Sequence, residues 1–156
     1  MDAVRLRVLE AEVAAQLAKI EQVYAELEDR AGQMQPGKSA FIESTAYQLQ
    51  NLYNAVEDLL KVVAAGFENS IADLTRWHTE LLDRMALEIR GVRPSLISAE
   101  CAAHLHELRA FRHFFRHAYG LSIDYDRVQE NLAKARLIRP LLRRDVDTFL
   151  AALQTD

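Results

Sequence analysis

The sequence predicts an all-α protein, an up-and-down bundle of about five to six helices. Apolar residues recur at steps of three and four along most of the chain, separated by residues that favour helix. Only 5 glycines and 3 prolines occur among 156 residues, which disfavours a turn-rich β-protein. Short loops between helices make neighbouring helices antiparallel. A chain of this length forms about one domain, so we expect residues 1–156 to make up a single helical domain.

The first helix is expected over residues 2–32, where Leu9, Val13 and Ile20 belong to a stripe of apolar residues at helical spacing. Two glycines and a proline then make a loop. Residues 32–39 also carry the letters of a phosphate-binding loop. Such a loop follows a β-strand, whereas an amphipathic helix is expected here. We therefore interpret the match as accidental.

Two further helices are expected over residues 39–65 and from about residue 71 to 88. Ser39 is a plausible N-cap for the first of them, because its hydroxyl can accept a hydrogen bond from the first turn. Gly91 and Pro94 then interrupt the helical pattern. A loop is therefore expected before the next helix.

A fourth helix is expected to begin after Ser98, a second plausible N-cap, and to run to about His117 or Tyr119. Gly120 is the natural left-handed residue to close it. Cys101, the single cysteine, lies in an Ala-rich part of this helix. We interpret it as a small buried residue rather than as a nucleophile.

The last part of the chain is expected to form a fifth helix, which Asp124 can cap. Pro140 either kinks this helix or starts a sixth, since proline is tolerated in the first turn of a helix and disrupts its interior. The N-terminus is charged and helical rather than an apolar signal sequence. No apolar run is long enough to cross a membrane, so we expect a cytoplasmic protein that does not contact membranes.

Charge is distributed unevenly along the chain. The net charge is −4, but residues 104–144 hold nine basic residues against four acidic ones. A local basic patch on an acidic protein is compatible with a polyanionic ligand. The alternative is that these basic side chains only solvate helix surfaces.

Residues 109–120 have the highest density of groups that can both transfer a proton and bind an anion. They include three arginines, two histidines and a tyrosine. Imidazole suits proton transfer near neutral pH, and the guanidinium group offers phosphate a planar fork of donors. Arg112, His117 and Tyr119 are therefore the leading candidates. Three neighbours are supporting candidates for binding an anion such as RNA: Arg109, His113 and Arg116.

Three interpretations of this segment compete. His113 and His117 have the spacing to chelate one metal ion, with His106 nearby, but no acidic residue joins that face. Alternatively, an arginine and a histidine can cleave RNA through its own 2′-hydroxyl without a metal. Arg112 and His117 lie about 140° apart on an ideal helix, so cleavage requires the helix to end near His117 or a dimer to complete the site. In the third interpretation the arginines pair with carboxylates and the histidines are solvated.

The segment resembles the signature of the HEPN superfamily, and within it of the HepT-like toxins. That signature is an arginine, a polar residue, a short apolar spacer, a histidine, any residue and a tyrosine. Here it reads Arg112-His113-Phe114-Phe115-Arg116-His117-Ala118-Tyr119. It lies late in the fourth expected helix, where the family has it, and the order of helices fits most of the chain. The resemblance implies a HEPN-like helical bundle.

The resemblance also implies an activity and its partners. HepT-like proteins are metal-independent endoribonucleases that need no cofactor and act as toxins of toxin–antitoxin pairs. They are homodimers in which the motifs of both protomers line one cleft. Their partner is an MntA-like nucleotidyltransferase antitoxin, which adds AMP to the motif tyrosine, here Tyr119. By position, Arg112 would bind phosphate and stabilise the transition state, His117 would transfer the proton, and His113 would be the polar residue after the arginine.

A function of a different class fits the same residues. The chain could be a non-catalytic helical binding module, which uses this surface to hold a minimal nucleotidyltransferase or a nucleotide. Cleavage of RNA by the purified protein separates the two hypotheses.

Overall fold

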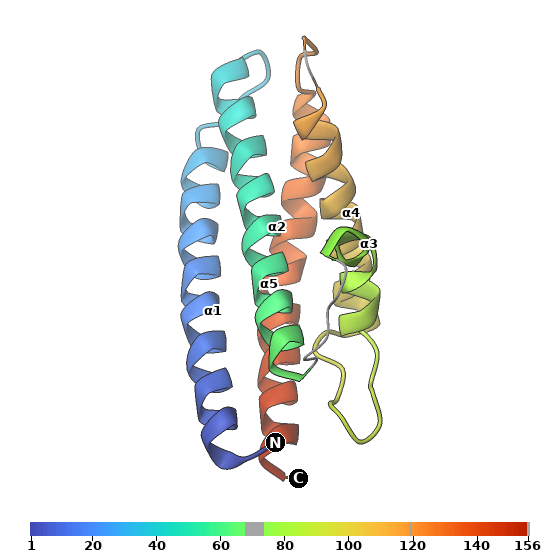
Figure 1. Ribbon diagram of the computed structural model, residues 1–156. Coiled ribbons are helices and arrows are strands. Elements are labelled where there is room, and N and C mark those ends of the chain that lie inside the picture. Colours follow the sequence, from blue (N-terminus) through green and yellow to red (C-terminus); the bar gives the residue numbers. More distant parts are fainter. Residues whose placement is uncertain (68–73, 119, 156) are drawn as a thin grey trace.

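The computed structural model describes residues 1–67, 74–118 and 120–155, with the backbone alone for residues 74–79 and 155. Every long element in these ranges is a helix, so the predicted all-α class is confirmed (Figure 1). The helices are α1 (Ala3–Ala31), α2 (Ser39–Phe67), α3 (Leu74–Met85), α4 (Ala99–Arg116) and α5 (Tyr125–Thr155).

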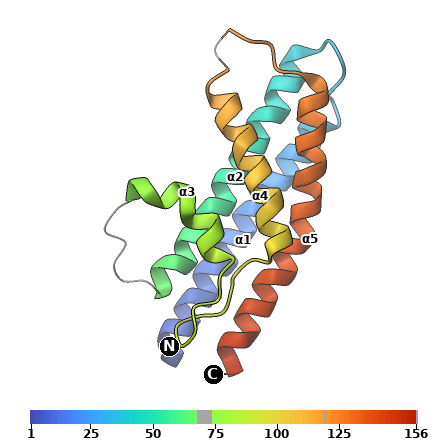
Figure 2. The same ribbon diagram turned by 90° about the vertical axis from the view of Figure 1, so that its right-hand side faces the viewer.

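Four long helices, α1, α2, α4 and α5, run along the length of the bundle and alternate in direction (Figures 1 and 2). α2 is the central element, because it packs against each of the other helices. The shorter α3 lies against α2 and α4, beside the four long helices. Over the residues described, none of the helices is long and apolar enough to cross a membrane.

α1 begins at a side-chain cap and presents one apolar face to α2. Oδ1 of Asp2 accepts hydrogen bonds from the N–H groups of Val4 and Arg5, at 3.0 and 2.9 Å. These bonds satisfy two of the donors that the start of every helix leaves without a helical partner. The buried residues recur at helical spacing along α1: Leu9, Val13, Gln16, Ile20, Tyr24 and Leu27.

The start of α2 and the end of α3 differ slightly from prediction. Ser39 is the first helical residue of α2 and not its N-cap, because the carbonyl of Lys38 already accepts from Ile42 in the first turn, at 3.2 Å. α3 ends at Met85, before the expected end at residue 88. The reason is that the α3–α4 loop donates to the carbonyl at the end of α3: the N–H of Leu96 donates to the carbonyl of Met85 at 2.9 Å.

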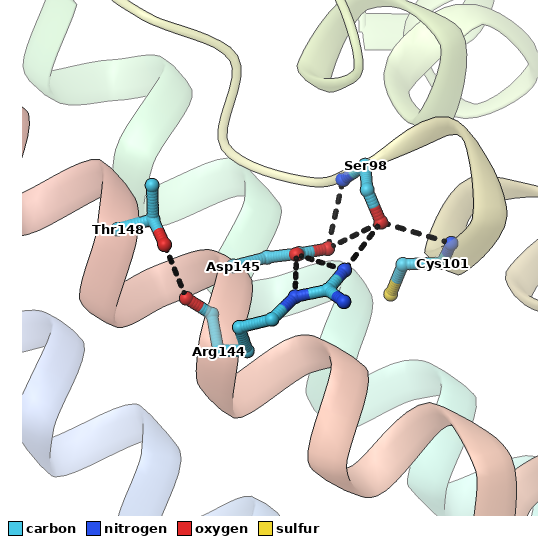
Figure 3. Close-up of polar contacts among 5 residues, drawn as sticks. All are labelled: Ser98, Cys101, Arg144, Asp145 and Thr148. Atoms are coloured by element: carbon cyan, nitrogen blue, oxygen red, sulfur yellow. Dashed lines mark hydrogen bonds and ion pairs between the residues drawn. The ribbon is translucent and has the colours of Figure 1, made fainter.

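The start of α4 is tied to α5. Ser98 caps α4 as predicted, because its Oγ accepts from the N–H of Cys101 at 3.2 Å. The N–H and Oγ–H of Ser98 both donate to Oδ2 of Asp145, at 2.8 and 2.7 Å (Figure 3). Arg144 donates to the other carboxylate oxygen at 2.9 Å. Asp145 therefore holds in place the first turn of the helix that carries the candidate residues.

The last part of the chain forms one helix, α5, and not two. Asp124 lies at its start, where Oδ1 accepts from the N–H of Asp126 at 3.2 Å. Pro140 lies inside α5, so of the two outcomes predicted there, a kink in the fifth helix or the start of a sixth, the second does not occur. Ile138 and Leu142 are 0% and 2% exposed, and burial of apolar residues on both sides of Pro140 holds the two halves in one helix despite the missing N–H donor.

Two other features of the sequence have structural roles. Cys101 is fully buried, and burial raises the pKa of its thiol to about 12, which keeps the thiol uncharged near neutral pH. Residues 32–38 connect α1 directly to α2, so a helix stands where a phosphate-binding loop needs a β-strand.

Candidate functional site

Most of the candidate residues line one hollow on the surface of α4. The hollow has a volume of about 360 Å³ and extends along the C-terminal half of the helix. Its lining residues are His106, Arg109, Ala110, Arg112, His113, Arg116 and His117. Three arginines and three histidines thus border the same space. Such a concentration of cationic and hydrogen-bonding groups suits an anionic ligand.

The end of α4 brings His117 to the same hollow as Arg112. The helix ends at Arg116, and His117 is its C-cap, with φ −110° and ψ 9°. The N–H of His117 donates to the carbonyl of Phe114 at 3.2 Å, which is the tighter spacing of a 3₁₀ turn. The prediction that the helix ends near His117 is therefore confirmed. The separation of about 140° expected on an ideal helix does not apply past this end.

The chain turns immediately beyond the hollow. Gly120 adopts the left-handed conformation predicted for it, with φ +71°. It stands beyond the C-cap, in a turn where the N–H of Leu121 donates to the carbonyl of Ala118 at 3.3 Å. Tyr119, the third leading candidate, lies outside the described residues.

α2 holds the guanidinium group of Arg112 in place. Nη1 donates to Oδ1 of Asn54 at 2.9 Å and lies 3.7 Å from Oε2 of Glu57. Cζ lies 4.4 Å from the ring centroid of Tyr53, a cation–π contact. The side chain of Arg112 is only 14% exposed, yet it borders the hollow. Arg112 is therefore anchored on α2 while part of it faces the candidate ligand site.

Glu57 is a buried carboxylate between two cations. Its side chain is 6% exposed, and Oε1 lies 3.1 Å from Nζ of Lys61, while Oε2 faces Arg112. A buried carboxylate is stable only with such compensation. Burial, together with the nearby charge of Glu57, raises the pKa of the Tyr53 hydroxyl above its ordinary value. The Glu57 carboxylate thus lies between two positive charges, and one of them, Lys61, is also 3.4 Å from the exposed carboxylate of Asp58.

The three histidines of the hollow have different surroundings. The rings of His113 and His117 lie 4.5 Å apart between centroids, and both residues are exposed. Nε2 of His106 lies 2.6 Å from Oδ1 of Asp83, which links α4 to α3. Among the described residues, no three His, Cys, Asp or Glu side chains are grouped so that they could hold a metal ion. The three-histidine site of the metal interpretation is therefore not assembled in this part of the chain.

The sequence matches the model of a family described as HepT-like protein over residues 44–153, well over half of the chain. The chain belongs to the HepT-like family. It is thus a member of the HEPN superfamily, as residues 112–119 predicted. No curated protein and no solved structure matches the chain significantly.

The matched region contains the whole candidate site of this HepT-like protein. It starts in the first turns of α2 and includes α3, α4 and nearly all of α5. α1 lies entirely outside the match and packs along α2 (Figure 1). Membership in the family suggests a toxin of the HEPN type.

The far side of α4 is covered by the protein's own chain. Cζ of Arg127 lies 3.7 Å from the ring centroid of Phe114. Phe115 stacks on Phe111, with 6.3 Å between ring centroids. Phe114, an apolar residue of the motif spacer, is partly buried against α5.

Sequence analysis missed the residues that hold the candidates in place. Tyr53, Asn54 and Glu57 anchor Arg112, and Asp83 binds a histidine. A signal for Glu57 was present, because it lies four residues after Tyr53 on the apolar face of a helix, where a carboxylate needs a cation. Asp83 gave no such signal, since it is exposed like most acidic residues.

Proposed function

We propose that this HepT-like protein is a metal-independent endoribonuclease, the toxin of a toxin–antitoxin pair. One observation carries the proposal: an anchored arginine, Arg112, and a histidine at a helix end, His117, border the same hollow. Family membership supports a toxin of the HEPN type. An arginine and an imidazole are sufficient to cleave RNA through its own 2′-hydroxyl.

The proposed reaction breaks the P–O5′ bond of RNA. The 2′-oxygen attacks the adjacent phosphorus, which leaves a 2′,3′-cyclic phosphate and a 5′-hydroxyl. His117 takes the proton of the 2′-hydroxyl, and a second acid protonates the departing O5′. Arg112 binds the non-bridging oxygens and stabilises the charge of the pentavalent phosphorus. In a homodimer whose two motifs line one cleft, the second copy of His117 supplies the second proton.

The remaining lining residues extend the binding surface. Arg109 and Arg116 lie three residues before and four after Arg112, so they reach phosphates on either side of the scissile one. The ring of His113 contacts that of His117 and orients it. Arg109 and Arg116 thus bind RNA and His113 orients His117, and none of the three takes part in the chemical step.

The same hollow supports a switch by covalent modification. Tyr119, two residues after His117, is the proposed acceptor of AMP from an MntA-like nucleotidyltransferase antitoxin. The transferred phosphate would place negative charge beside the arginines. It would then compete with RNA for Arg112.

Cleavage of a labelled RNA by purified protein tests the proposal. We expect His117→Ala to lower the rate by at least about a hundredfold and Arg112→Lys, which loses the fork of donors, to lower it comparably. Arg90→Ala, an exposed arginine outside the hollow, serves as the control. A His117→Ala variant that cleaves as fast as wild type contradicts the proposal. Wild-type protein that binds RNA or a nucleotidyltransferase without cleaving RNA supports the non-catalytic binding module.

A further inference from the structure

We infer that Asn54 and Glu57 of α2 are positioning residues, which orient Arg112 toward a phosphate in the hollow. The inference rests on the proposed function, because it assigns these residues a part in the same phosphate site. Neither residue touches the hollow itself. Their contribution therefore passes through Arg112.

The geometry restricts how Arg112 can meet a ligand. Cζ of Arg112 lies over the ring of Tyr53, 4.4 Å from its centroid, and Oδ1 of Asn54 accepts from Nη1 at 2.9 Å. A guanidinium group carries five N–H donors in one plane. With the group packed over the Tyr53 ring and one donor engaged, the guanidinium group cannot rotate freely. Its remaining edge is therefore presented in one orientation, as bidentate binding of phosphate requires.

The charges preserve the attraction for an anion. A lone Glu57 would neutralise Arg112 and weaken its pull on phosphate. Lys61, at 3.1 Å from Glu57 Oε1, supplies a second positive charge. The closest approach of Arg112 to Glu57 is 3.7 Å, longer than a hydrogen bond. Glu57 thus attracts Arg112 toward α2, while Lys61, which also contacts the exposed Asp58, offsets part of the negative charge of Glu57.

The anchor is costly, which argues against an incidental contact. Long basic side chains on helix surfaces usually stay solvated, and holding one still costs conformational entropy. Burying the carboxylate of Glu57 adds a desolvation cost. Both costs belong to the contact between α2 and Arg112, an arginine that borders the hollow. By contrast, Arg116, which lines the same hollow, is exposed.

The chain offers matched controls for both positioning residues. Asn51, one turn before Asn54 on α2, bonds to Gln48 within the same helix. Asp58, next to Glu57, lies 3.4 Å from the same Lys61 and is exposed. Asn54→Ala is therefore compared with Asn51→Ala. Glu57→Gln, which removes one charge and keeps the shape, is compared with Asp58→Asn.

The first readout is the ¹⁵N–¹H NMR spectrum of the arginine side chains. The signal that is missing from the spectrum of Arg112→Lys is assigned to Arg112. We expect Asn54→Ala and Glu57→Gln to move this signal to the position of mobile arginines and to leave the backbone spectrum of the core unchanged. The controls should leave the signal in place. An Arg112 signal that is the same in wild type and in Glu57→Gln overturns the inference.

The second readout is steady-state cleavage of RNA. Misplacement of a catalytic group mainly slows the chemical step, so we expect kcat to fall roughly 10- to 100-fold while KM changes far less. In the Arg112→Lys background, Glu57→Gln should cause almost no further loss, because both changes act through one group. Two results would overturn the inference. One is an equal fall in kcat in the control variants, and the other is a full further fall in kcat when Glu57→Gln is added to Arg112→Lys.

An anion titration separates this inference from the proposed function. Inorganic pyrophosphate should shift the Arg112 signal of wild-type protein. Glu57→Gln should weaken that binding about tenfold, because a misoriented Arg112 loses a charge-assisted hydrogen bond to the anion. Protein that cleaves no RNA but shows this difference contradicts the ribonuclease and supports the positioning. Equal pyrophosphate affinity in both proteins contradicts the positioning, whether or not RNA is cleaved.

Discussion

Arg112 and His117 are held in different ways, and the difference predicts different sensitivities to substitution. Side chains of α2 hold Arg112, which is 14% exposed. The backbone holds His117, which caps α4 and points an exposed ring toward solvent. Removing the Arg112 side chain leaves the buried Glu57 with one cation fewer. Removing the imidazole of His117 leaves no buried group without compensation.

Arg112→Ala should lower the free energy of unfolding by about 2 kcal/mol, somewhat below the usual loss for half of a buried ion pair because Lys61 also compensates Glu57. His117→Ala should change it by less than about 0.5 kcal/mol. Urea unfolding followed by circular dichroism measures both. The double variant Arg112→Met/Glu57→Gln, which removes both charges, should recover part of the loss. Equal destabilisation by Arg112→Ala and His117→Ala would show that the anchor is not as described.

Each end of α4 has its own fixed structure, and the two ends serve different purposes. The first turn is tied to α5 by the bonds from Ser98 to Asp145. The last turn ends at His117 with a 3₁₀ bond. The bonds at the start fix the position of the helix in the bundle. The end of the helix sets the position of the His117 imidazole.

Asp145→Ala should lower the free energy of unfolding by about 2 kcal/mol, because it removes two charge-assisted bonds from Ser98 in a buried setting. Asp147→Ala, an exposed carboxylate on the same helix, should change it by less than about 0.5 kcal/mol. Guanidinium unfolding of the two variants at equal protein concentration provides the comparison. If Asp145→Ala and Asp147→Ala lower the free energy of unfolding equally, the hydrogen bonds between Ser98 and Asp145 do not stabilise the fold.

The contact between α1 and α5 depends on pH. Arg136 donates to both carboxylate oxygens of Glu28, at 2.9 and 2.8 Å, and these bonds hold the pKa of Glu28 below its ordinary value of 4.5. A lowered carboxyl pKa in the folded state stabilises the fold above pH 4.5, and this contribution is lost as the pH falls through the folded-state pKa. Glu28 is 41% exposed, so solvent screening limits the contribution to less than about 1 kcal/mol.

Glu28→Gln should therefore lower the Tm at neutral pH and have little effect in strongly acidic buffer. Thermal melts of wild type and variant at pH 7 and pH 3 give the two differences. Raising the salt concentration at pH 7 should reduce the difference in Tm between wild type and variant, because salt screens an ion pair near the surface. A difference that grows toward acid pH has the wrong sign for a carboxylate whose pKa is lowered.

At the scale of the whole molecule, the architecture was readable from the sequence because each long helix has its own apolar stripe and its own ends. Leu9, Val13 and Ile20 of α1 are buried as their spacing predicted. Pro140 left two outcomes open, because a sequence pattern cannot show that α2 and α4 pack against α5 and that apolar residues on both sides of Pro140 are buried. Tertiary packing overrides such local signals.

The candidate site was only partly readable. The order of charged and aromatic residues in α4 predicted that Arg112 and His117 act together, and both line one hollow in the structure. The anchor on α2 was not found, because Asn54 and Glu57 lie 58 and 55 positions earlier in the chain. Contacts at that separation depend on how helices pack, which no local spacing records.

The proposed homodimer gives a prediction for the whole molecule. Sedimentation equilibrium should find twice the chain mass of 17.8 kDa at the concentrations where RNA is cleaved, because one chain offers a single His117 for two proton transfers. A mixture of His117→Ala and Arg112→Lys proteins should also regain part of the activity if one cleft draws on both protomers. A monomer with full activity would contradict the dimeric site.

The central claim is that Arg112 and His117 cleave RNA through its 2′-hydroxyl without a metal. The most direct test is cleavage of two matched oligonucleotides in excess EDTA, one of RNA and one in which every 2′-hydroxyl is replaced by 2′-O-methyl. We predict that the RNA is cut at an undiminished rate to products with 2′,3′-cyclic phosphates, and that the methylated strand stays intact. Loss of cleavage in EDTA, or cleavage of the methylated strand, would contradict the account.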